Sequence, residues 1–242
     1  MNAEINGAGI RFKEYFEVAE ARTDALRDEV YRIRHEVYCE DLAFEPQRAD
    51  RRETDEYDVY SLHVLMRSVQ TGEFMGCARV IQTRMDDRDY PLPFEKACAG
   101  ALDRTLVDPA QLPRHAIGEV SRLAVVGRYR RRKGEQHRHV PVSEGDFGTL
   151  QQPRFPYILI GLYLGAVEIA RQHGIEQLFV LTEERLASHF RKLGVDVQTI
   201  GTPIEHRGVR IPSLISVSRV IEELKPVVLP MYRAIAADLE RR

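Results

Sequence analysis

The stretch "GEVSRLAVVGRYRRRKGEQHRH", residues 118–139, decides the fold, because it joins an apolar segment directly to a dense cluster of positive charge. Its first part is rich in Val, Leu and Ala, which is typical of a buried strand, although it also carries Glu119 and Arg122. Its second part holds six Lys or Arg residues and two His residues. The sequence therefore predicts a core strand that runs into a basic loop. The fold depends on what pairs with that strand.

The overall composition excludes several broad classes of protein. A hydrophobic content of 43% over 242 residues is enough for a real core, and 35 Lys and Arg nearly balance 37 Asp and Glu, for a net charge of −2. A chain this close to neutral is not a general nucleic-acid binder, and the basic stretch is short with little aromatic character beyond Tyr129. Any electrostatic recognition is therefore local, and we expect no nucleic-acid partner.

The cysteines and apolar segments point to a cytoplasmic protein. Cys39, Cys77 and Cys98 are odd in number and form no CxxC pair, and the histidines show no metal-ligand spacing, so we expect no disulfide and no metal. The first residues contain acidic side chains and lack the apolar region of a signal peptide. The longest apolar stretch, residues 157–170, contains Glu168 and is shorter than the about 20 residues that span a bilayer, so we expect no membrane span.

The N-terminal half predicts a helix, a long loop and a hairpin. Apolar residues at helical spacing behind a Thr23 cap predict a helix over residues 24–40. The polar stretch 43–60 is long for a simple connection, and we interpret it as a lid over a substrate. Two runs rich in β-branched residues around residues 70–73 predict a β-hairpin, and residues 93–100 predict a short helix.

The C-terminal half predicts alternating strands and helices. In order these are a strand at 115–126, a helix at 154–173, a strand at 176–182, a helix at 183–194 that ends at Gly194, strand-like segments at 195–200 and 213–220, and a helix after Pro226 or Pro230. The first strand, helix and strand predict a right-handed parallel crossover within an otherwise antiparallel sheet. We therefore expect one α/β (α+β) domain over residues 1–242, with a mixed, mostly antiparallel central sheet flanked by helices.

Five short motifs occur in a recognisable order and spacing. They are "YRIRHEVYCEDLAFE" (31–45), "ETDEYD" (53–58), "GCARVIQT" (76–83), "PLPFE" (91–95) and "GEVSRLAV" (118–125). Together they resemble the acyl-homoserine-lactone synthases, a branch of the GNAT acyltransferase superfamily. The first helix and the loop "RYRRRKGEQ" look closer still to the acyltransferases of exosortase and PEP-CTERM sorting systems, and more loosely to N-acyl amino acid synthases. The resemblance covers about residues 12–220 and implies a GNAT-like fold with a splayed parallel strand pair.

The resemblance also implies which residues form the site. Carried over by position, the substrate-binding residues are Arg34, Tyr38, Phe44, Asp55, Asp58, Arg79, Phe94 and Arg122. Tyr38 and Phe44 stand where the lactone synthases usually have Phe and Trp, so S-adenosylmethionine is not implied as the acceptor. Asp55 and Asp58 either recognise the ammonium group of an acceptor or belong to a solvated acidic loop. Arg34 and Arg79 either take part in chemistry or, as we favour, pair with these acids and hold the lid.

Acyl transfer from a thioester to an amine needs a base, a partner for the oxyanion and room for a pantetheine arm. The resemblance implies that "SRLAVV" (121–126) and "EQLFVLT" (176–182) part to receive the arm, with backbone N–H groups near Val125 and Val126 at the oxyanion. Glu119 is the candidate base, because burial raises the pKa of a carboxyl group. Residues three apart on a regular strand face opposite sides, so Glu119 and Arg122 share one substrate only across a bulge; otherwise both are structural.

The basic stretch has two functional explanations. "RRKGEQ" (131–136) nearly matches the R-x-x-G-x-G/A loop by which GNAT proteins hold the pyrophosphate of coenzyme A, although Gln136 breaks its last position. Its cations, with those just before it, equally suit the acidic surface of an acyl carrier protein, which we favour. These residues are Arg128, Arg130, Arg131, Arg132 and Lys133. A third explanation is a solvated loop without a partner. Likewise the helix at 157–170, with Phe155 and Phe179, either lines an acyl tunnel or is simply core.

We therefore expect an acyltransferase that moves a medium or long fatty acyl group from an acyl-carrier-protein thioester to the amine of an amino-acid-like acceptor. The product is of the N-acyl amino acid or acyl-homoserine-lactone type. We expect no tightly bound cofactor, with acyl-carrier protein or acyl-coenzyme A as the donor substrate. Direct attack is expected, because no Ser or Cys lies in a nucleophile motif. The alternatives are an acetyl-coenzyme A-dependent N-acetyltransferase and a non-catalytic module that binds an acyl carrier.

Overall fold

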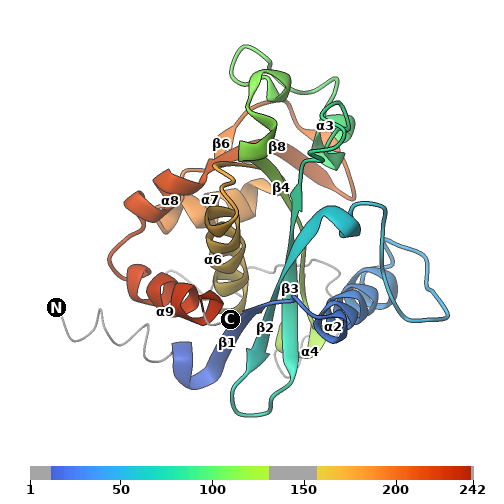
Figure 1. Cartoon of the computed structure of the whole chain (residues 1–242), viewed down its shortest axis with the longest axis vertical. Helices are drawn as coiled ribbons and strands as arrows, with labels where there is room; N and C mark the ends of the chain where they lie inside the picture. The colour runs from blue at the N-terminus through green and yellow to red at the C-terminus, as the bar shows by residue number, and fades with distance from the viewer. Residues whose placement is uncertain (1–11, 131–156, 241–242) are drawn as a thin grey trace.

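The strands form one open, mixed sheet. The computed structural model describes residues 12–130 and 157–240, and its strand order is β1-β2-β3-β4-β5-β8-β6, with β7 paired to β8 (Figure 1). The strands are β1 (Phe16–Glu20), β2 (Ser61–Ser68), β3 (Phe74–Gln82), β4 (Ile117–Val125), β5 (Gln177–Thr182), β6 (Gln198–Thr199), β7 (Ile204–Glu205) and β8 (Val209–Ser216). Within these residues every strand pair is antiparallel except β4 with β5. The predicted fold class, mixed and mostly antiparallel, is confirmed.

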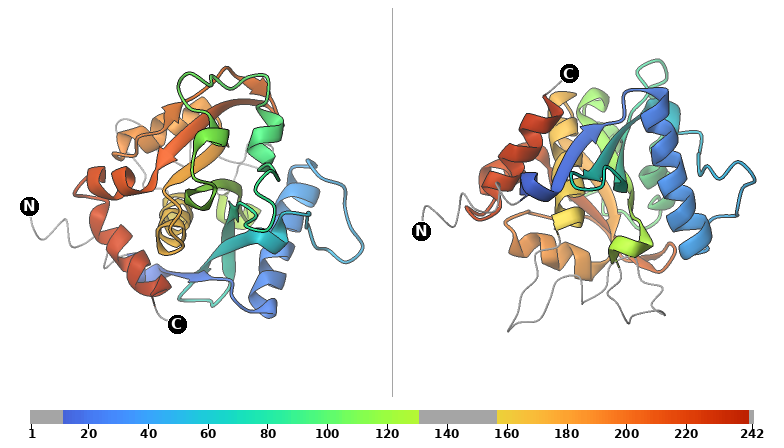
Figure 2. Two further views of the ribbon diagram at one scale, coloured as in Figure 1. Left: turned by 45° about the horizontal axis from the view of Figure 1, so that its top comes forward. Right: turned by 90° about the horizontal axis from the view of Figure 1, so that it is seen from below.

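Helices cover both faces of this sheet. The helices are α2 (Asp24–Arg34), α3 (Pro93–Ala97), α4 (Gly127–Arg130), α6 (Tyr157–Gln172), α7 (Glu184–Lys192), α8 (Val217–Glu223) and α9 (Leu229–Leu239). Short turns of 3₁₀ helix lie at Asp58–Tyr60, Pro109–Gln111 and Arg114–Ala116. Figures 1 and 2 show α6 and α9 on one side of strands β1 to β4 and α2 on the other.

Helix α6 forms the centre of the larger core because nearly all of its side chains are apolar and buried. It lies close to β2, and a Cβ atom at Gly165 would be only 2.8 Å from Val64. Its one buried carboxylate, Glu168, is satisfied by the hydroxyl of Tyr232 at 2.6 Å and by the guanidinium of Arg171 at 2.7 Å. The Tyr232 bond holds α9 against α6, and the Arg171 bond lies within α6.

The parallel strands β4 and β5 diverge. They pair only over the first three residues of β4, where Ile117, Gly118 and Glu119 lie opposite Gln177, Leu178 and Phe179. Beyond Glu119, β4 stays paired with β3 and β5 stays paired with β8, so the sheet opens between them. This slot leaves backbone groups on two facing strand edges without ladder partners, which is the geometry that an extended ligand can fill.

A bulge in β4 lies where the slot begins. The register between β3 and β4 shifts by one residue between Cys77 and Arg79, so that Ala78 faces an extra residue of β4. Arg122 lies in this shift with a φ of 52°, a left-handed conformation that is uncommon for a residue with a Cβ atom. Glu119 and Arg122 could face one substrate only if a bulge lay between them, and the structure contains that bulge.

The structure differs from the sequence predictions at three places. The helix predicted over 24–40 is α-helical only to Arg34 and continues as a π-helix over His35–Asp41. The strand predicted at 213–220 was wrong in its second half, because Ser216 caps a helix there by accepting from the N–H of Arg219. Strand β1 was not predicted; it completes the sheet edge beside β2. The single-domain organisation over residues 1–242 stays a prediction.

None of the helices in the described ranges, 12–130 and 157–240, has the length and apolar character to cross a membrane.

Candidate active site

A cavity of about 390 Å³ occupies the slot between β4 and β5. Its walls come from the π-helix that follows α2, the loop before β2, β3, α3, both parted strands, α6, α7 and the β7–β8 hairpin. Seven of the residues predicted for the site line it: Tyr38, Phe44, Asp55, Arg79, Phe94, Glu119 and Arg122. Segments that are far apart in the sequence therefore meet at the one place where the sheet is open.

Glu119 lies on the α3 side of the cavity and is 7% exposed. Its Oε2 atom accepts the backbone N–H of Phe94 at 2.7 Å. Burial raises the pKa of Glu119 to about 7, although the Phe94 N–H and the positive charges of Arg79 and Arg122 act in the opposite direction. A carboxyl group with this pKa exchanges protons near neutral pH, as a general base must.

Arg122 connects the bulge to the loop before β2. Its Nη2 atom lies 3.0 Å from Oε1 of Glu53 and 3.2 Å from Oδ2 of Asp55. Its guanidinium carbon also lies 5.6 Å from the ring centre of Tyr38, whose hydroxyl donates to the Leu123 carbonyl at 3.0 Å. These contacts fix the backbone of β4 just beyond Glu119.

A buried network of charges supports this wall. The Arg34 guanidinium binds Oε2 of Glu53 at 2.5 Å and Oδ1 of Asp58 at 2.6 Å, and Arg79 Nη1 binds Oδ1 of Asp58 at 2.9 Å and Oδ1 of Asp55 at 2.7 Å. Burial alone would raise the pKa of Asp58, but the charges of Arg34 and Arg79 outweigh it and lower that pKa to about 2. Glu53 shows the same balance: burial raises its pKa, and Arg34 and Arg122 lower it to about 2.

Arg34 and Asp58 do not line the cavity. Arg34 is fully buried and Asp58 is 8% exposed, so neither reaches a substrate in this structure. Arg34 binds Glu53, and Asp58 binds Arg79 and accepts the backbone N–H of Asp55, so the two buried residues hold residues of the cavity wall in place. This matches the interpretation that the arginines pair with the acidic loop. The loop is also fastened elsewhere, because the N–H of Arg48 donates to Nε2 of the buried His35 at 3.0 Å.

The predicted oxyanion donor needs correction. The N–H of Val126 donates to the carbonyl of Met75 at 2.9 Å, and neither Val125 nor Val126 lines the cavity. Val126 is therefore engaged in the sheet because β3 still covers that edge of β4. An oxyanion donor in this slot must come from the other edge, nearer Leu123, which does line the cavity.

Most of the basic stretch lies outside the described residues. Arg131, Arg132, Lys133 and Phe155 fall there, as does the side chain of Arg130. Arg128 is described: it is exposed, its Nη2 lies 3.7 Å from Oε2 of Glu73, and it does not line the cavity.

The far side of the cavity is apolar. It is lined by Val120, Leu123, Tyr163, Val180, Leu186, Phe190, Val197 and Ile215. The ring of Tyr163 stacks on Phe190 at 4.2 Å between centres, so α6 does contribute to the cavity wall. Phe179 does not; it is buried, and its ring stacks on that of Phe94 at 4.9 Å between centres.

Sequence reasoning missed several residues of the site. Glu53 forms ion pairs with both Arg34 and Arg122. The one sequence signal for it was its place as the first residue of the "ETDEYD" motif. His206, Arg207 and Arg210 reach the cavity from the β7–β8 hairpin. Nothing in the local sequence of that hairpin indicates where it folds.

The described residues contain no group of three or more His, Cys, Asp and Glu side chains placed to hold a metal ion. Cys39, Cys77 and Cys98 are buried and free, and burial raises the pKa of both Cys77 and Cys98 to about 12. None of the three lines the cavity.

One family model matches part of the chain. Residues 33–138 match the family model of the acetyltransferase (GNAT) domain, a segment that runs from the end of α2 through β4 into the basic stretch. No curated protein matches the chain significantly.

Solved structures share the fold at low sequence identity. TofI, in a ternary complex with an inhibitor and MTA, is 23% identical, with 88% of this chain and 98% of that chain covered and a TM-score of 0.58. The coenzyme A-dependent acyl-homoserine lactone synthase BjaI, with MTA, is 17% identical, with 90% and 89% covered and a TM-score of 0.59. The N-acyl amino acid synthase FeeM, from uncultured soil microbes, is 13% identical, with 86% and 94% covered and a TM-score of 0.54. The GNAT-like fold that the five motifs implied is confirmed.

Proposed function

We propose that this chain, an acyltransferase with a GNAT domain, moves a medium or long fatty acyl group from an acyl-carrier-protein thioester to the amine of an amino-acid-like acceptor. The observation that carries the proposal is the position of Glu119, a buried carboxyl group with a pKa near 7 at the start of a slot between parted parallel strands. A base of matched pKa lies where an extended thioester arm fits. The apolar far side of the cavity suits an alkyl chain.

The reaction needs one proton transfer before attack. Glu119 takes a proton from the acceptor ammonium, directly or through a water molecule, and the free amine then attacks the thioester carbonyl. A C–N bond forms, and the nitrogen, which is now positively charged, loses its second proton to water. The tetrahedral oxyanion then collapses, the C–S bond breaks, and the leaving thiolate takes up the proton that Glu119 removed from the ammonium. Direct attack is favoured over an acyl-enzyme because the described cysteines lie outside the cavity with thiol pKa values that burial raises.

The donor is proposed to be a carrier protein because the cations after β4 complement an acidic partner. Two alternatives have specific support. The family model that matches is named for acetyltransferases, and BjaI is coenzyme A-dependent, which favours an acetyl- or acyl-coenzyme A donor. A non-catalytic module that binds an acyl carrier would use the same cations.

One experiment separates these functions. The protein is incubated with acyl carrier proteins and coenzyme A thioesters of different chain lengths, together with amino acids and S-adenosylmethionine, and amide products are sought by mass spectrometry. We expect long-chain amides from the carrier-protein donors. Products from acetyl-coenzyme A alone would support the acetyltransferase, and tight carrier-protein binding without any amide would support the non-catalytic module.

The basic stretch is tested with a triple Arg130, Arg131, Arg132→Ala variant. We expect weaker binding of the acyl carrier protein, with most of the loss disappearing at high salt because the contact is electrostatic. Arg67→Gln is the control, since Arg67 forms an exposed pair with Glu17 of β1 and lies two strands from β4. Unchanged, salt-insensitive binding in the triple variant would remove the docking role.

A further inference from the structure

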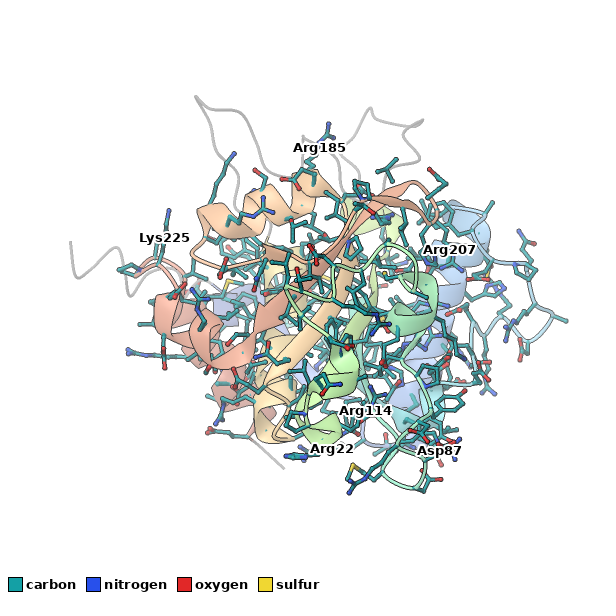
Figure 3. The ribbon with its side chains drawn as sticks, turned by 90° about the horizontal axis from the view of Figure 1, so that it is seen from above. Arg22, Asp87, Arg114, Arg185, Arg207 and Lys225 are labelled. Carbon is teal, nitrogen blue, oxygen red and sulfur yellow. The ribbon has the colours of Figure 1, made fainter. Side chains whose placement is uncertain are left out.

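Glu45 lies between two arginines that come from opposite sides of the slot. Its Oε1 atom is 3.6 Å from Nη2 of Arg122 and forms an ion pair with Nη2 of Arg207. Arg122 is on β4, and Arg207 is in the hairpin between β7 and β8. Figure 3 shows Arg207 on the side of the molecule that carries α2. One carboxylate oxygen therefore connects the two halves of the opened sheet.

Both arginines have unusual backbone conformations. Arg122 has a φ of 52° and Arg207 a φ of 55°, in the left-handed region that glycine adopts much more readily. Gly208, next to Arg207, also has a positive φ, as expected for a tight hairpin turn. The two guanidinium groups are thus presented from left-handed backbone positions, one at the β4 bulge and one in the hairpin turn.

The two guanidinium groups belong to the cavity of Glu119. Arg122, Arg207 and Glu119 all line it, and Arg207 keeps 31% of its side chain exposed. The hairpin faces the same side of the sheet as Glu119, because Ile204 of β7 packs in the cluster that contains Phe94. A group bound between the arginines is therefore in the same compartment as the candidate base.

We infer that the carboxylate of the acceptor binds between Arg122 and Arg207, in the place that Glu45 fills in this structure. The inference rests on the proposed function and names its acceptor as an amino acid that keeps its carboxylate. The fit is already shown by Glu45, which is itself a carboxylate, and guanidinium groups bind carboxylates in forked geometry. Glu45 is then an internal competitor that the acceptor displaces.

A phosphate group of the donor would be recognised by similar chemistry, but the local charges favour a carboxylate. Glu53 and Asp55 lie 3.0 and 3.2 Å from the Arg122 guanidinium and repel any further anion. The pyrophosphate of a coenzyme A donor carries two negative charges and is repelled more strongly than a singly charged carboxylate. The single phosphodiester of a carrier-protein arm is distinguished from the acceptor by the donor measurement below. The site therefore suits the acceptor.

The test measures binding of matched product pairs by calorimetry. The probes are N-decanoyl-leucine and N-decanoyl-phenylalanine, each compared with the N-decanoyl amine of the same side chain that lacks the carboxylate. We expect the wild-type protein to bind the acids more tightly. In Arg207→Gln the affinity for the acids falls about 10-fold or more while that for the amines stays the same. Arg207→Lys, which keeps the charge but not the fork, gives an intermediate loss.

Glu45→Gln gives the opposite expectation. Removing the competing charge raises the affinity for the N-decanoyl acids several-fold and leaves the affinity for the matched amines unchanged. Arg67→Gln, whose ion pair with Glu17 is exposed on β2, changes neither. Thermal melting of each variant checks that the fold is kept.

Three outcomes would overturn the inference. Equal binding of acid and amine by the wild-type protein leaves acyl transfer standing and removes the carboxylate site. A loss in Arg207→Gln for acyl-coenzyme A or acyl carrier protein, with the acids unaffected, assigns the arginine to the donor. If the wild-type protein binds neither probe and forms no amide with any acceptor, the proposed function fails as well.

Discussion

The backbone N–H of Phe94 donates to the carboxylate of Glu119 at 2.7 Å, and this bond joins α3 to the strand that borders the slot. It holds the Glu119 carboxylate in place while burial raises its pKa to about 7. The bond sets the position, whereas burial sets the raised pKa and outweighs the lowering effect of the same N–H. A substitution can therefore change the acidity and keep the position.

Glu119→Gln is such a substitution. The amide oxygen still accepts the Phe94 N–H, but the side chain no longer takes up a proton, so we expect a fall of about 10²- to 10⁴-fold in kcat/KM with little change in melting temperature. In the wild-type protein kcat/KM rises with pH through about 7, because the base is the ionised form above its pKa. Loss of that inflection in the variant is the measurement. Equal activity of the two proteins would remove Glu119 from the mechanism.

The buried acids predict how stability depends on pH. The pKa values of Glu53 and Asp58 are lowered to about 2, so their ionised forms stabilise the folded protein above the ordinary pKa of a carboxyl group, and this contribution is lost as the pH falls towards 2. Glu119 acts with the opposite sign. Its raised pKa gives a contribution that is complete below about 4 and is lost as the pH rises through about 7.

Asp58→Asn tests the acid side of this profile. The change leaves Arg34 and Arg79 without one of their carboxylates, and breaking such a buried pair costs about 3–5 kcal/mol. Urea unfolding across pH should show lower stability near neutral pH and a smaller loss on acidification than in the wild-type protein. Asp86→Asn is the control, because Asp86 pairs with Arg84 on the surface. A variant as stable as the wild type would show that the network does not hold the wall.

The sequence predicted much of the fold because its strongest signals were local. Periodic apolar residues and the Thr23 cap located α2, and the apolar stretches located β4, β5 and α6. The π-helix at His35–Asp41 could not be read in this way. Its extra residue per turn lets Tyr38 reach the Leu123 carbonyl, which is a tertiary contact.

The site was predicted where a motif carried it and missed where only folding creates it. Glu119, Arg122, Arg79 and Asp55 lie on motifs, and the structure brings them to one cavity. Arg207 and Glu45 are 162 residues apart, and their contact depends on how far the sheet opens. No local sequence pattern indicates how far the sheet opens, so this contact could not be predicted.

Tyr163 and Tyr232 make a matched pair for a prediction about buried hydroxyl groups. The hydroxyl of Tyr163 is buried without a hydrogen-bond partner, whereas that of Tyr232 donates to Glu168 at 2.6 Å. A buried polar group without a partner is unfavourable, so we expect Tyr163→Phe to leave the free energy of unfolding unchanged or to raise it. Tyr232→Phe should lower it by about 1–3 kcal/mol. Chemical denaturation of both variants checks the contrast, which a clear loss in Tyr163→Phe would contradict.

Filling the slot tests whether the opening between β4 and β5 is needed. Val180 lies on β5 just beyond Phe179, which is the last residue of β5 that pairs with β4, and it lines the cavity. Val180→Phe adds a ring there, so we expect long-chain donors to lose kcat/KM more than short-chain donors while the melting temperature changes little, since the new volume enters a cavity and not packed core. Val180→Ile, with one added methylene, should show a smaller loss in the same order. Equal rates for all chain lengths in Val180→Phe would mean that the acyl chain does not pass between the two strands.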